Sequence, residues 1–526
     1  MAIRHYVALF VLLLLAAPLA GAQGDESTAP PGGGEEVRRS PHDEEFSQRE
    51  KEYEELIEEV RRAAPEYASL HYPRPRGYEE ISEICLAEED AALLEYIVGE
   101  NFSALWVLRR PGAEDGKEEG KEKEEAGLSV FVLERDEVVE AARAFYESIS
   151  DPLSSDYKER GQALYELVFR PAEPLLEGKT DLFIVPDGIL TYVPFEALAD
   201  ERGRYLLDRF TMTYAPSASV LADILQEQAK GPAADAGRKT AFLGVGDPVF
   251  SESGKSTQEE HEKQEKQEKP EEGEGEGGGD SFPDEPATLR GLYEEEGYSF
   301  ARLPYTGVEV EAVAELFGSG EEDVLLRGRA REEEIKRRDL AKYEIIHFAT
   351  HGVVDEEFPP RSGVVLSLPG GPRAGEDGFL QVAEIFNLRL DADLVTLSAC
   401  RAGLGEDTVR GEGLAGLTRA FLHAGAPSVL VSLWSVNELT TAHLMKQFYT
   451  RLREGQTKAE ALRGARSAMA EKKIDLGPLK RRLQEREAAA ASDGKADAPP
   501  AKKGGRRMDA SHPFYWAAFV LVGSPG

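Results

Sequence analysis

Short apolar runs and amphipathic stretches alternate along the last two thirds of the chain. The runs carry aliphatic and β-branched residues with little polar alternation, which is typical of parallel strands covered on both faces. Amphipathic stretches lie between several runs, which predicts an α/β fold whose mostly parallel sheet has helices on both faces. The predicted strands span residues 182–185, 241–245, 324–326, 343–350, 364–368, 394–398, 428–433 and 517–522, and the predicted helices span residues 308–317, 331–339, 413–424, 440–453 and 458–470.

A smaller region precedes this domain. Apolar residues at helical spacing predict a helix over residues 46–64, which stops before Pro65. Two strand-like runs joined by a loop that contains Gly99 predict a β-hairpin. We therefore expect a helix and β-hairpin region at residues 46–150, followed by the main domain at residues 151–526. The predicted strands of the smaller region span residues 92–98, 104–108 and 128–133, and helices are predicted at residues 137–148 and 157–176.

Three polar tracts lack the apolar residues that a packed core needs. Residues 23–45 are rich in Gly, Pro and Glu and are predicted to be a disordered leader. Residues 251–284 are dominated by Glu, Lys, Gln and Gly, and residues 488–507 by Ala, Lys and Gly. We interpret the last two tracts as disordered, solvated insertions in the main domain.

The N-terminus has the pattern of a secretory signal. Arg4 and His5 precede an apolar run at residues 7–17, and the small residues Ala20 and Ala22 follow. This pattern predicts a signal peptide at residues 1–22 and an exported protein, periplasmic or extracellular. The run is too short for a comfortable membrane span, so we expect no stable membrane insertion after cleavage. The alternative is an uncleaved segment that anchors the chain.

Composition excludes several classes of function. The chain has 98 acidic and 62 basic residues, a formal net charge of −36. Such a surface argues against nucleic-acid binding, which depends on basic residues facing phosphates. Only two cysteines occur, Cys85 and Cys400, which is too few for a disulfide framework or a cysteine-based zinc site. We expect neither a cofactor nor a metal, and the oligomeric state stays open.

Two of the predicted strands end in reactive side chains. One ends at His351 and the other at Cys400, and in parallel sheets chemistry collects at the carboxyl ends of strands. Adjacent strands would bring a thiol and an imidazole together as nucleophile and base. The backbone amides of Gly352 and Cys400 would then face the oxyanion of a tetrahedral intermediate. The alternatives are a small buried cysteine and a histidine bound to a backbone carbonyl. We interpret His347, which lies deeper in the strand, as structural.

The residues around this pair resemble a known family. Ala399-Cys400-Arg401 is similar to the caspase nucleophile signature, whose histidine lies about 50 residues upstream. More specifically, the chain resembles the CHAT family of caspase-like, separase-related cysteine peptidases over residues 65–526, apart from the insertions. The segments that carry this resemblance are residues 183–188 and 194–198, 214–217, 243–248, His347-Phe348-Ala349-Thr350-His351-Gly352, Leu397-Ser398-Ala399-Cys400, 432–436 and 512–519.

The resemblance implies a caspase-like fold and a cysteine endopeptidase that acts on proteins or peptides. In that interpretation His351 is the general base, and Cys400 attacks the peptide carbonyl to form a thioester. Glu438 would bind a basic substrate side chain at the P1 position, because separase-like relatives have an acidic residue in this segment. Many family members have Asp-Asp where this chain has Asn437-Glu438, and the alternative role of Glu438 is in a solvated helix N-terminus. A non-catalytic scaffold with a peptidase fold, binding a peptide or protein, is the alternative function.

Overall fold

The computed structural model describes most of the main domain and part of the region before it. The described residues are 62, 74–99, 102–110, 127–231, 240–250, 300–368, 376–402, 411–471, 473–492 and 507–526, and for residues 399–402 and 490–492 the description covers the backbone. The predicted signal peptide, the leader, the insertion at residues 251–284 and nearly all of the predicted helix at residues 46–64 lie outside them. Export of the chain therefore stays a prediction.

One sheet of 13 strands runs through the described chain. Its main path is β10-β9-β8-β11-β12-β15-β5-β4-β1-β2-β3, with β6 also paired to β8 and β7 paired to β6. The order shows that the last strand, β15, lies in the middle of the sheet. The strands are β1 Ala91–Val98, β2 Ser103–Arg109, β3 Leu128–Leu133, β4 Asp181–Val185, β5 Thr211–Tyr214, β6 Thr240–Gly246, β7 Val324–Leu326, β8 Tyr343–Val354, β9 Gly363–Val365, β10 Phe379–Gln381, β11 Leu394–Ala402, β12 Ser428–Ser432 and β15 Phe519–Gly523.

The sheet consists of two halves of opposite strand direction. In one half β7, β6, β8, β11 and β12 are mutually parallel. In the other half β15, β5, β4 and β1 are parallel to one another. The direction reverses where β12 pairs antiparallel with β15. The predicted hairpin of β1 and β2 is present and joins the same sheet through β4. These pairings confirm the predicted α/β class with a mostly parallel sheet.

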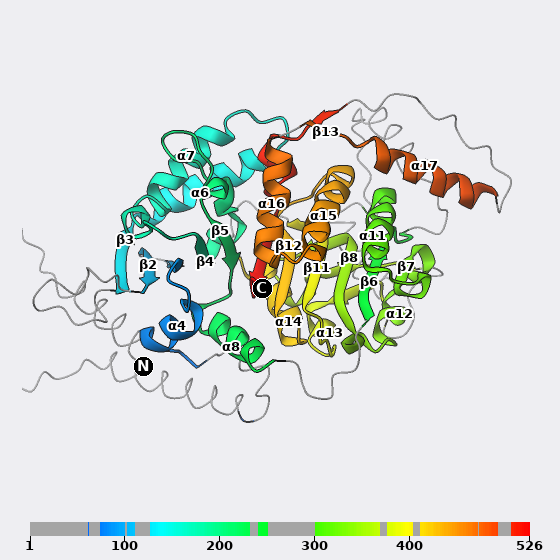
Figure 1. The fold of residues 1–526 in the computed structure, drawn as a ribbon, viewed down its shortest axis with the longest axis horizontal. Helices are drawn as coiled ribbons and strands as arrows, with labels where there is room; N and C mark the ends of the chain where they lie inside the picture. The colour runs from blue at the N-terminus through cyan, green and yellow to red at the C-terminus, as the bar shows by residue number, and fades with distance from the viewer. Residues whose placement is uncertain are drawn as a thin grey trace, which may run out of the picture.

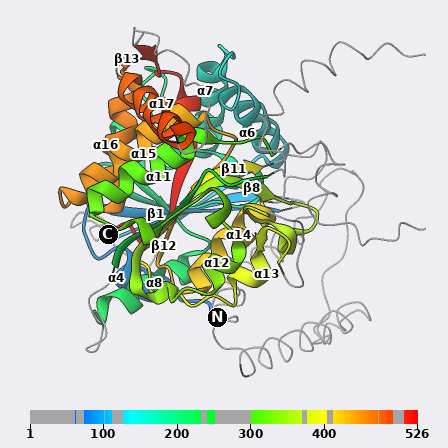
Figure 2. The ribbon, with the colours of Figure 1, turned by 90° about the vertical axis from the view of Figure 1, so that its right-hand side faces the viewer.

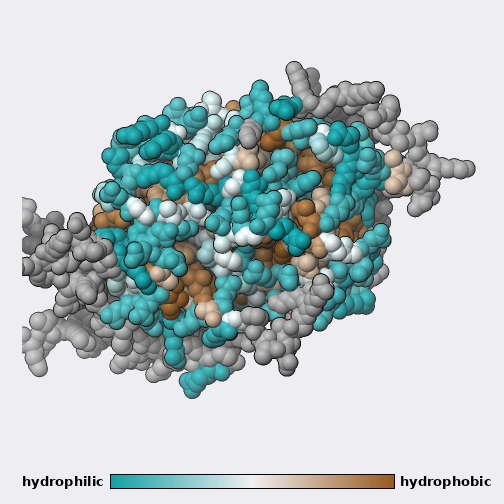
Figure 3. Space-filling view, viewed as in Figure 1, coloured by the Kyte–Doolittle hydropathy of each residue, from teal (hydrophilic) through white to brown (hydrophobic). Residues whose placement is uncertain are grey.

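Helices cover both faces of this sheet (Figures 1 and 2). One layer contains α6 Arg135–Ile149, α7 Tyr157–Val168, α11 Pro304–Phe317, α15 Glu438–Arg453, α16 Lys458–Ala470 and α17 Gly477–Ser492. The opposite layer contains α4 Tyr78–Cys85, α8 Ala218–Ala229, α12 Glu332–Lys336, α13 Val382–Ile385 and α14 Glu412–His423. Beside the layer of α16, a separate ribbon pairs β13 Lys473–Ile474 with β14 Met508–Asp509. Hydrophilic residues dominate the face in Figure 3, with smaller apolar areas between them.

Several predicted boundaries were wrong, each for a local reason. The helix predicted over residues 157–176 ends at Val168, because Pro171 and Pro174 disfavour helical backbone at the residues before them. The strand predicted over residues 364–368 is only three residues long, Gly363–Val365. The insertion predicted at residues 488–507 begins inside a helix, since α17 continues to Ser492 through an alanine run, and alanine has the highest helix propensity.

A buried ion pair connects α16 to the half of the sheet that contains β5 and β15. Arg466 on α16 binds Glu196 with an N–O distance of 2.5 Å, and both side chains are almost fully buried. Glu196 also accepts a hydrogen bond from the Tyr214 hydroxyl at the end of β5. A second guanidinium nitrogen of Arg466 donates to the Phe519 carbonyl oxygen in β15. The pair thus joins a helix to the strands at the point where the sheet reverses.

Candidate active site

Three neighbouring parallel strands have their carboxyl ends at one edge of the sheet. Gly246, the last residue of β6, pairs with Ala349 of β8. Cys400 of β11 pairs with Gly352 of β8, the residue after His351. The backbone therefore places the sequence-predicted His351 and Cys400 on adjacent strands at nearly the same level. Asp247, which directly follows β6, lies at the same edge and was not predicted.

The strands do not end at His351 and Cys400, as the sequence had suggested. They continue to Val354 and Ala402, because β9 pairs with the last part of β8 on its other side. Gly352 and Cys400 consequently lie within paired strands. Their predicted role as oxyanion donors stays a prediction.

A β-bulge lies at His351. Ser398 pairs with Ala349, and Cys400 pairs with Gly352. Between these two pairs, β11 has one residue, whereas β8 has two, Thr350 and His351. A bulge interrupts the regular alternation of side chains and redirects one of them, and bulges are frequent beside active sites. His351 is consequently half-buried at the strand edge, while Thr350 is buried and donates to the Val365 carbonyl.

The ring of His351 has a defined orientation. Its Nε2 lies 2.7 Å from the carbonyl oxygen of Ala301. The rings of Phe250 and Phe300 pack beside it, with centroids 5.0 Å and 5.7 Å away. A carbonyl oxygen only accepts, so Nε2 must carry a proton, and in the neutral ring the lone pair then belongs to Nδ1. A histidine bound to a backbone carbonyl was the structural alternative, but the same contact also holds a general base in one tautomer.

Asp247 is the most deeply buried charge at this edge. Its side chain is fully buried and contacts the guanidinium groups of Arg302, Arg327 and Arg486. The sequence signal for it was weak, because Gly-Asp-Pro after a strand is an ordinary turn sequence. Only the fold shows that this aspartate lies one strand away from His351.

Glu438 is the first residue of α15 and contacts the start of a second helix. Its Oε2 accepts a hydrogen bond from the backbone amide of Tyr305, in the first turn of α11, at 3.0 Å. A carboxylate is stabilised at a helix N-terminus by the unpaired amides and the helix dipole. Burial nevertheless raises the pKa of Glu438 to about 7, and the carboxylates of Asp247 and Glu309 add to the shift. The P1 role of Glu438 stays a prediction.

His347 belongs to a closed polar network beneath the edge. Its Nε2 lies 2.8 Å from Glu309 on α11, and its Nδ1 lies 2.9 Å from the hydroxyl of Tyr449 on α15. The Tyr449 hydroxyl also contacts Thr396 of β11 at 2.8 Å. All four side chains are buried, which supports the interpretation of His347 as a structural residue.

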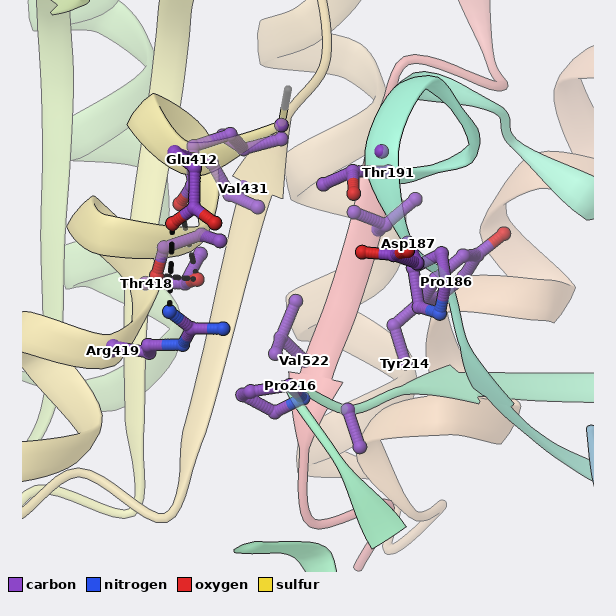
Figure 4. A pocket seen from close by; sticks show the side chains of 16 residues that line it. Pro186, Asp187, Thr191, Tyr214, Pro216, Glu412, Thr418, Arg419, Val431 and Val522 are labelled. Atoms are coloured by element: carbon purple, nitrogen blue, oxygen red, sulfur yellow. Dashed lines mark hydrogen bonds and ion pairs between the residues drawn. The ribbon is translucent and has the colours of Figure 1, made fainter. Parts of the chain in front are cut away.

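A cavity of about 90 Å³ lies between the two halves of the sheet (Figure 4). Glu412 and Arg419 of α14 lie on one side of it, 3.8 Å apart, and Asp187 and Thr191 lie on the other side. His351 is not among the residues that line it, so we do not assign the predicted chemistry to it.

Two features of the described residues concern other classes of function. Among them, no group of three or more His, Cys, Asp or Glu side chains is arranged to hold a metal ion. Within the same ranges, none of the helices is both long enough and apolar enough to cross a membrane.

Comparisons with known proteins extend this picture. Tetratricopeptide repeat protein 28 of Mus musculus is 25% identical over 401 residues, which cover 69% of this chain and 13% of that protein. The Homo sapiens protein of the same name is 23% identical over 406 residues, with the same coverage of 69% and 13%. This chain thus spans only a small part of the length of the curated relatives it matches.

Similar solved structures include a separase–securin complex and a cysteine proteinase. The chain matches the Saccharomyces cerevisiae separase–securin complex with a TM-score of 0.36 and 10% identity, covering 85% of this chain and 30% of that chain. It matches the Arg-specific cysteine proteinase gingipain R with a TM-score of 0.31 and 10% identity, covering 72% and 69%. A family model described as the CHAT domain matches residues 158–524. That match covers well over half of the chain, which therefore belongs to the CHAT family predicted from its motifs.

Proposed function

We propose that the chain is a caspase-like cysteine endopeptidase in which His351 and Cys400 cleave peptide bonds. The observation that carries this proposal is the backbone pairing of Cys400 with Gly352 on parallel strands, because Gly352 directly follows His351 in the sequence. The contact of His351 Nε2 with the Ala301 carbonyl supports it, because this contact leaves the lone pair on Nδ1. Membership of the CHAT family is a further support.

The proposed reaction has two steps. Nδ1 of His351 accepts the thiol proton of Cys400, and the sulfur attacks the carbonyl carbon of the substrate. The tetrahedral oxyanion is stabilised by backbone amides, for which Gly352 and Cys400 are the candidates. The intermediate collapses to a thioester, and His351 returns the proton to the leaving amine. Water then attacks the thioester with His351 as base, which releases the acid and restores the thiol.

The proposal also specifies the substrate, which has a basic residue at the P1 position. Glu438 lies against the start of α11 with one backbone partner, and a guanidinium or ammonium group is the natural partner of such a carboxylate. Glu438 is the candidate contact, since its carboxylate is partly accessible while those of Asp247 and Glu309 are fully buried.

The decisive test compares the wild-type chain with Cys400→Ala on peptides that contain Arg or Lys, under reducing conditions. We expect cleavage by the wild type and a loss of at least about 10³-fold in Cys400→Ala, because no other group supplies the nucleophile. His351→Ala should show a similar loss. Equal cleavage by wild type and Cys400→Ala would exclude the assignment.

A non-catalytic scaffold that binds a peptide or protein is the second candidate. The curated relatives are named for a repeat rather than for a peptidase activity, which favours it. The two functions differ in the reactivity of Cys400. Burial raises the pKa of the Cys85 thiol to about 12, so Cys85 serves as a slow internal reference. An endopeptidase predicts that an alkylating reagent modifies Cys400 much faster than Cys85 near pH 7, whereas similar rates favour a scaffold.

A further inference from the structure

The segment Phe300, Ala301, Arg302 and Leu303, here called the strap, contacts the proposed general base. The strap leads into α11, which begins at Pro304. Its Ala301 carbonyl oxygen lies 2.7 Å from Nε2 of His351, and the ring of Phe300 packs against the same imidazole. The orientation of His351 therefore depends on where the backbone of the strap is held.

Arg302, the next residue of the strap, is anchored at two points. Its Nε lies 2.9 Å from Oδ1 of Asp247, and its Nη2 lies 3.0 Å from Oδ2. This two-point geometry fixes the direction of the guanidinium as well as its distance. Arg302 directly follows Ala301. The ion pair between Arg302 and Asp247 therefore restricts the peptide unit that carries the Ala301 carbonyl oxygen.

The aspartate at the other end of this contact is itself firmly held. The Asp247 side chain is fully buried and also binds Arg327 at 3.2 Å and Arg486 at 3.0 Å. Its backbone amide donates to the Thr306 hydroxyl, and its carbonyl accepts from the Arg327 amide. With φ at 44°, it adopts a left-handed conformation that a non-glycine residue maintains only where its surroundings require it. Asp247 is therefore a rigid anchor at the end of β6.

We propose that Arg302 is a positioning residue for the peptidase reaction. Held by Asp247, it keeps the Ala301 carbonyl on Nε2 of His351 and so maintains the tautomer whose Nδ1 accepts the thiol proton. The inference rests on the proposed function, because it concerns the same base. Arg327 and Arg486 bind the same carboxylate, but neither is adjacent in sequence to Ala301. Of the three arginines, Arg302 alone transmits its position directly to the carbonyl.

The experiment compares Arg302→Met with Arg327→Met, a matched control that removes another guanidinium from the same aspartate. For Arg302→Met we expect kcat to fall about 10- to 100-fold with little change in KM, since small displacements of a catalytic group have effects of this size. Arg327→Met should stay within about threefold of wild type, since it loses one of several contacts. Arg302→Lys, which keeps the charge but loses the two-point geometry, should lie between Arg302→Met and wild type.

The pH profile separates positioning from a general loss of structure. The Ala301 carbonyl accepts from His351 and so favours the protonated ring, whose two nitrogens both donate. Loss of the contact changes the surroundings of the imidazole, so the acidic limb of kcat/KM should move in Arg302→Met but stay in place in Arg327→Met. The pH dependence of Cys400 alkylation, followed by mass spectrometry, should shift in the same direction without any need for turnover.

Two results would overturn the inference. One is that Arg302→Met and Arg327→Met have the same kcat and the same acidic limb of kcat/KM. Arg302 would then be a purely structural ion-pair partner. The other is a rise in activity, which would mean that the strap blocks the site. If Arg302→Met does not fold, an Arg302→Lys variant with the kcat and the acidic limb of the wild type would equally overturn the inference. Failure of the proposed function has a different signature, namely equal cleavage by the wild type and Cys400→Ala.

Discussion

At the scale of single residues, several buried carboxylates lie at one edge of the sheet. Keeping all of them charged there costs free energy. Asp247 has three arginine partners, whereas Glu309 has one carboxyl oxygen without a hydrogen-bond partner among the described residues. Glu438 is near enough to both carboxylates to be repelled by their charge and has one backbone partner of its own. Burial and these neighbours raise its pKa to about 7, which makes it the group that changes charge near neutral pH.

Glu438→Gln should therefore change how stability depends on pH. A carboxyl whose folded pKa is raised binds more protons in the folded state than in the unfolded state between about pH 4.5 and pH 7. Its contribution to stability is complete below that window and is lost as the pH rises through it. We expect Glu438→Gln to be more stable relative to wild type at pH 8 than at pH 5, by on the order of 2 kcal/mol. Glutamine still accepts from the Tyr305 amide.

Denaturant unfolding at pH 5, 6, 7 and 8 measures this difference directly. Glu454→Gln, at an exposed glutamate at the far end of the same helix, is the control and should parallel wild type. If the free energies of unfolding of Glu438→Gln and wild type change with pH in the same way, Glu438 is charged throughout the range.

At the scale of elements, the sequence predicted the strands that are buried on both faces and missed those that depend on partners. Residues 394–398 and 428–433 are uncharged runs of mostly aliphatic residues, and both are central strands. β5, Thr211–Tyr214, alternates polar and apolar residues over four positions, which is too short for a reliable pattern. The tendency of chemistry to collect at the carboxyl ends of parallel strands likewise predicted that His351 and Cys400 lie on adjacent strands.

The rest of the site depends on contacts between distant segments. The bulge at His351 arises from the pairing of β8 with β11, and the extension of β8 arises from β9. Asp247 and Arg302 are 55 positions apart, and charged residues in a chain this acidic give no sign of which pair will meet. Sequence patterns report burial and periodicity, whereas such pairings appear only after the chain has folded.

The helix α14 provides a prediction at this scale. Glu356, just after β8, accepts hydrogen bonds from the backbone amides of Glu412 and Gly413 at 3.1 Å each, in the first turn of α14. It also accepts from the Tyr192 hydroxyl. Glu356→Ala should lower the free energy of unfolding by about 1 kcal/mol, as loss of a helix cap does. Denaturant unfolding measures it.

Glu357→Ala is the matched control, because Glu357 is an exposed neighbour of the same type. It should unfold like wild type. An equal loss in both variants would mean that charge in this loop, rather than capping of α14, determines the stability.

At the scale of the whole molecule, the buried pair of Arg466 and Glu196 connects α16 to the half of the sheet that contains β5 and β15. Removal of one partner leaves the other charge buried and unpaired, which typically costs about 3–5 kcal/mol. Glu196→Gln should therefore lower the free energy of unfolding by roughly that amount. The Tyr214 hydroxyl and the Phe519 carbonyl, which complete the network, would also lose part of their fixed geometry.

Glu201→Gln is the control for this variant. Glu201 also binds an arginine, Arg170, at 2.6 Å, but both side chains are largely exposed. Solvent screens such pairs, so this variant should change stability very little. If Glu196→Gln unfolds at the same denaturant concentration as Glu201→Gln, the buried pair does not stabilise the packing of α16 on the sheet.

The central place of β15 has a consequence for the order in which this chain folds during synthesis. β15 pairs with β12 on one side and β5 on the other, yet it is the last of the described strands to leave the ribosome. The half that contains β5 must wait with an open edge while more than 300 residues between β5 and β15 are made, and the half that contains β12 waits while residues 433–518 are made. Exposed strand edges favour aggregation. Because the chain is made from its N-terminus, the pairing of residues 519–523 is the last step in forming the sheet. The nascent chain is therefore most in need of chaperones just before these residues appear.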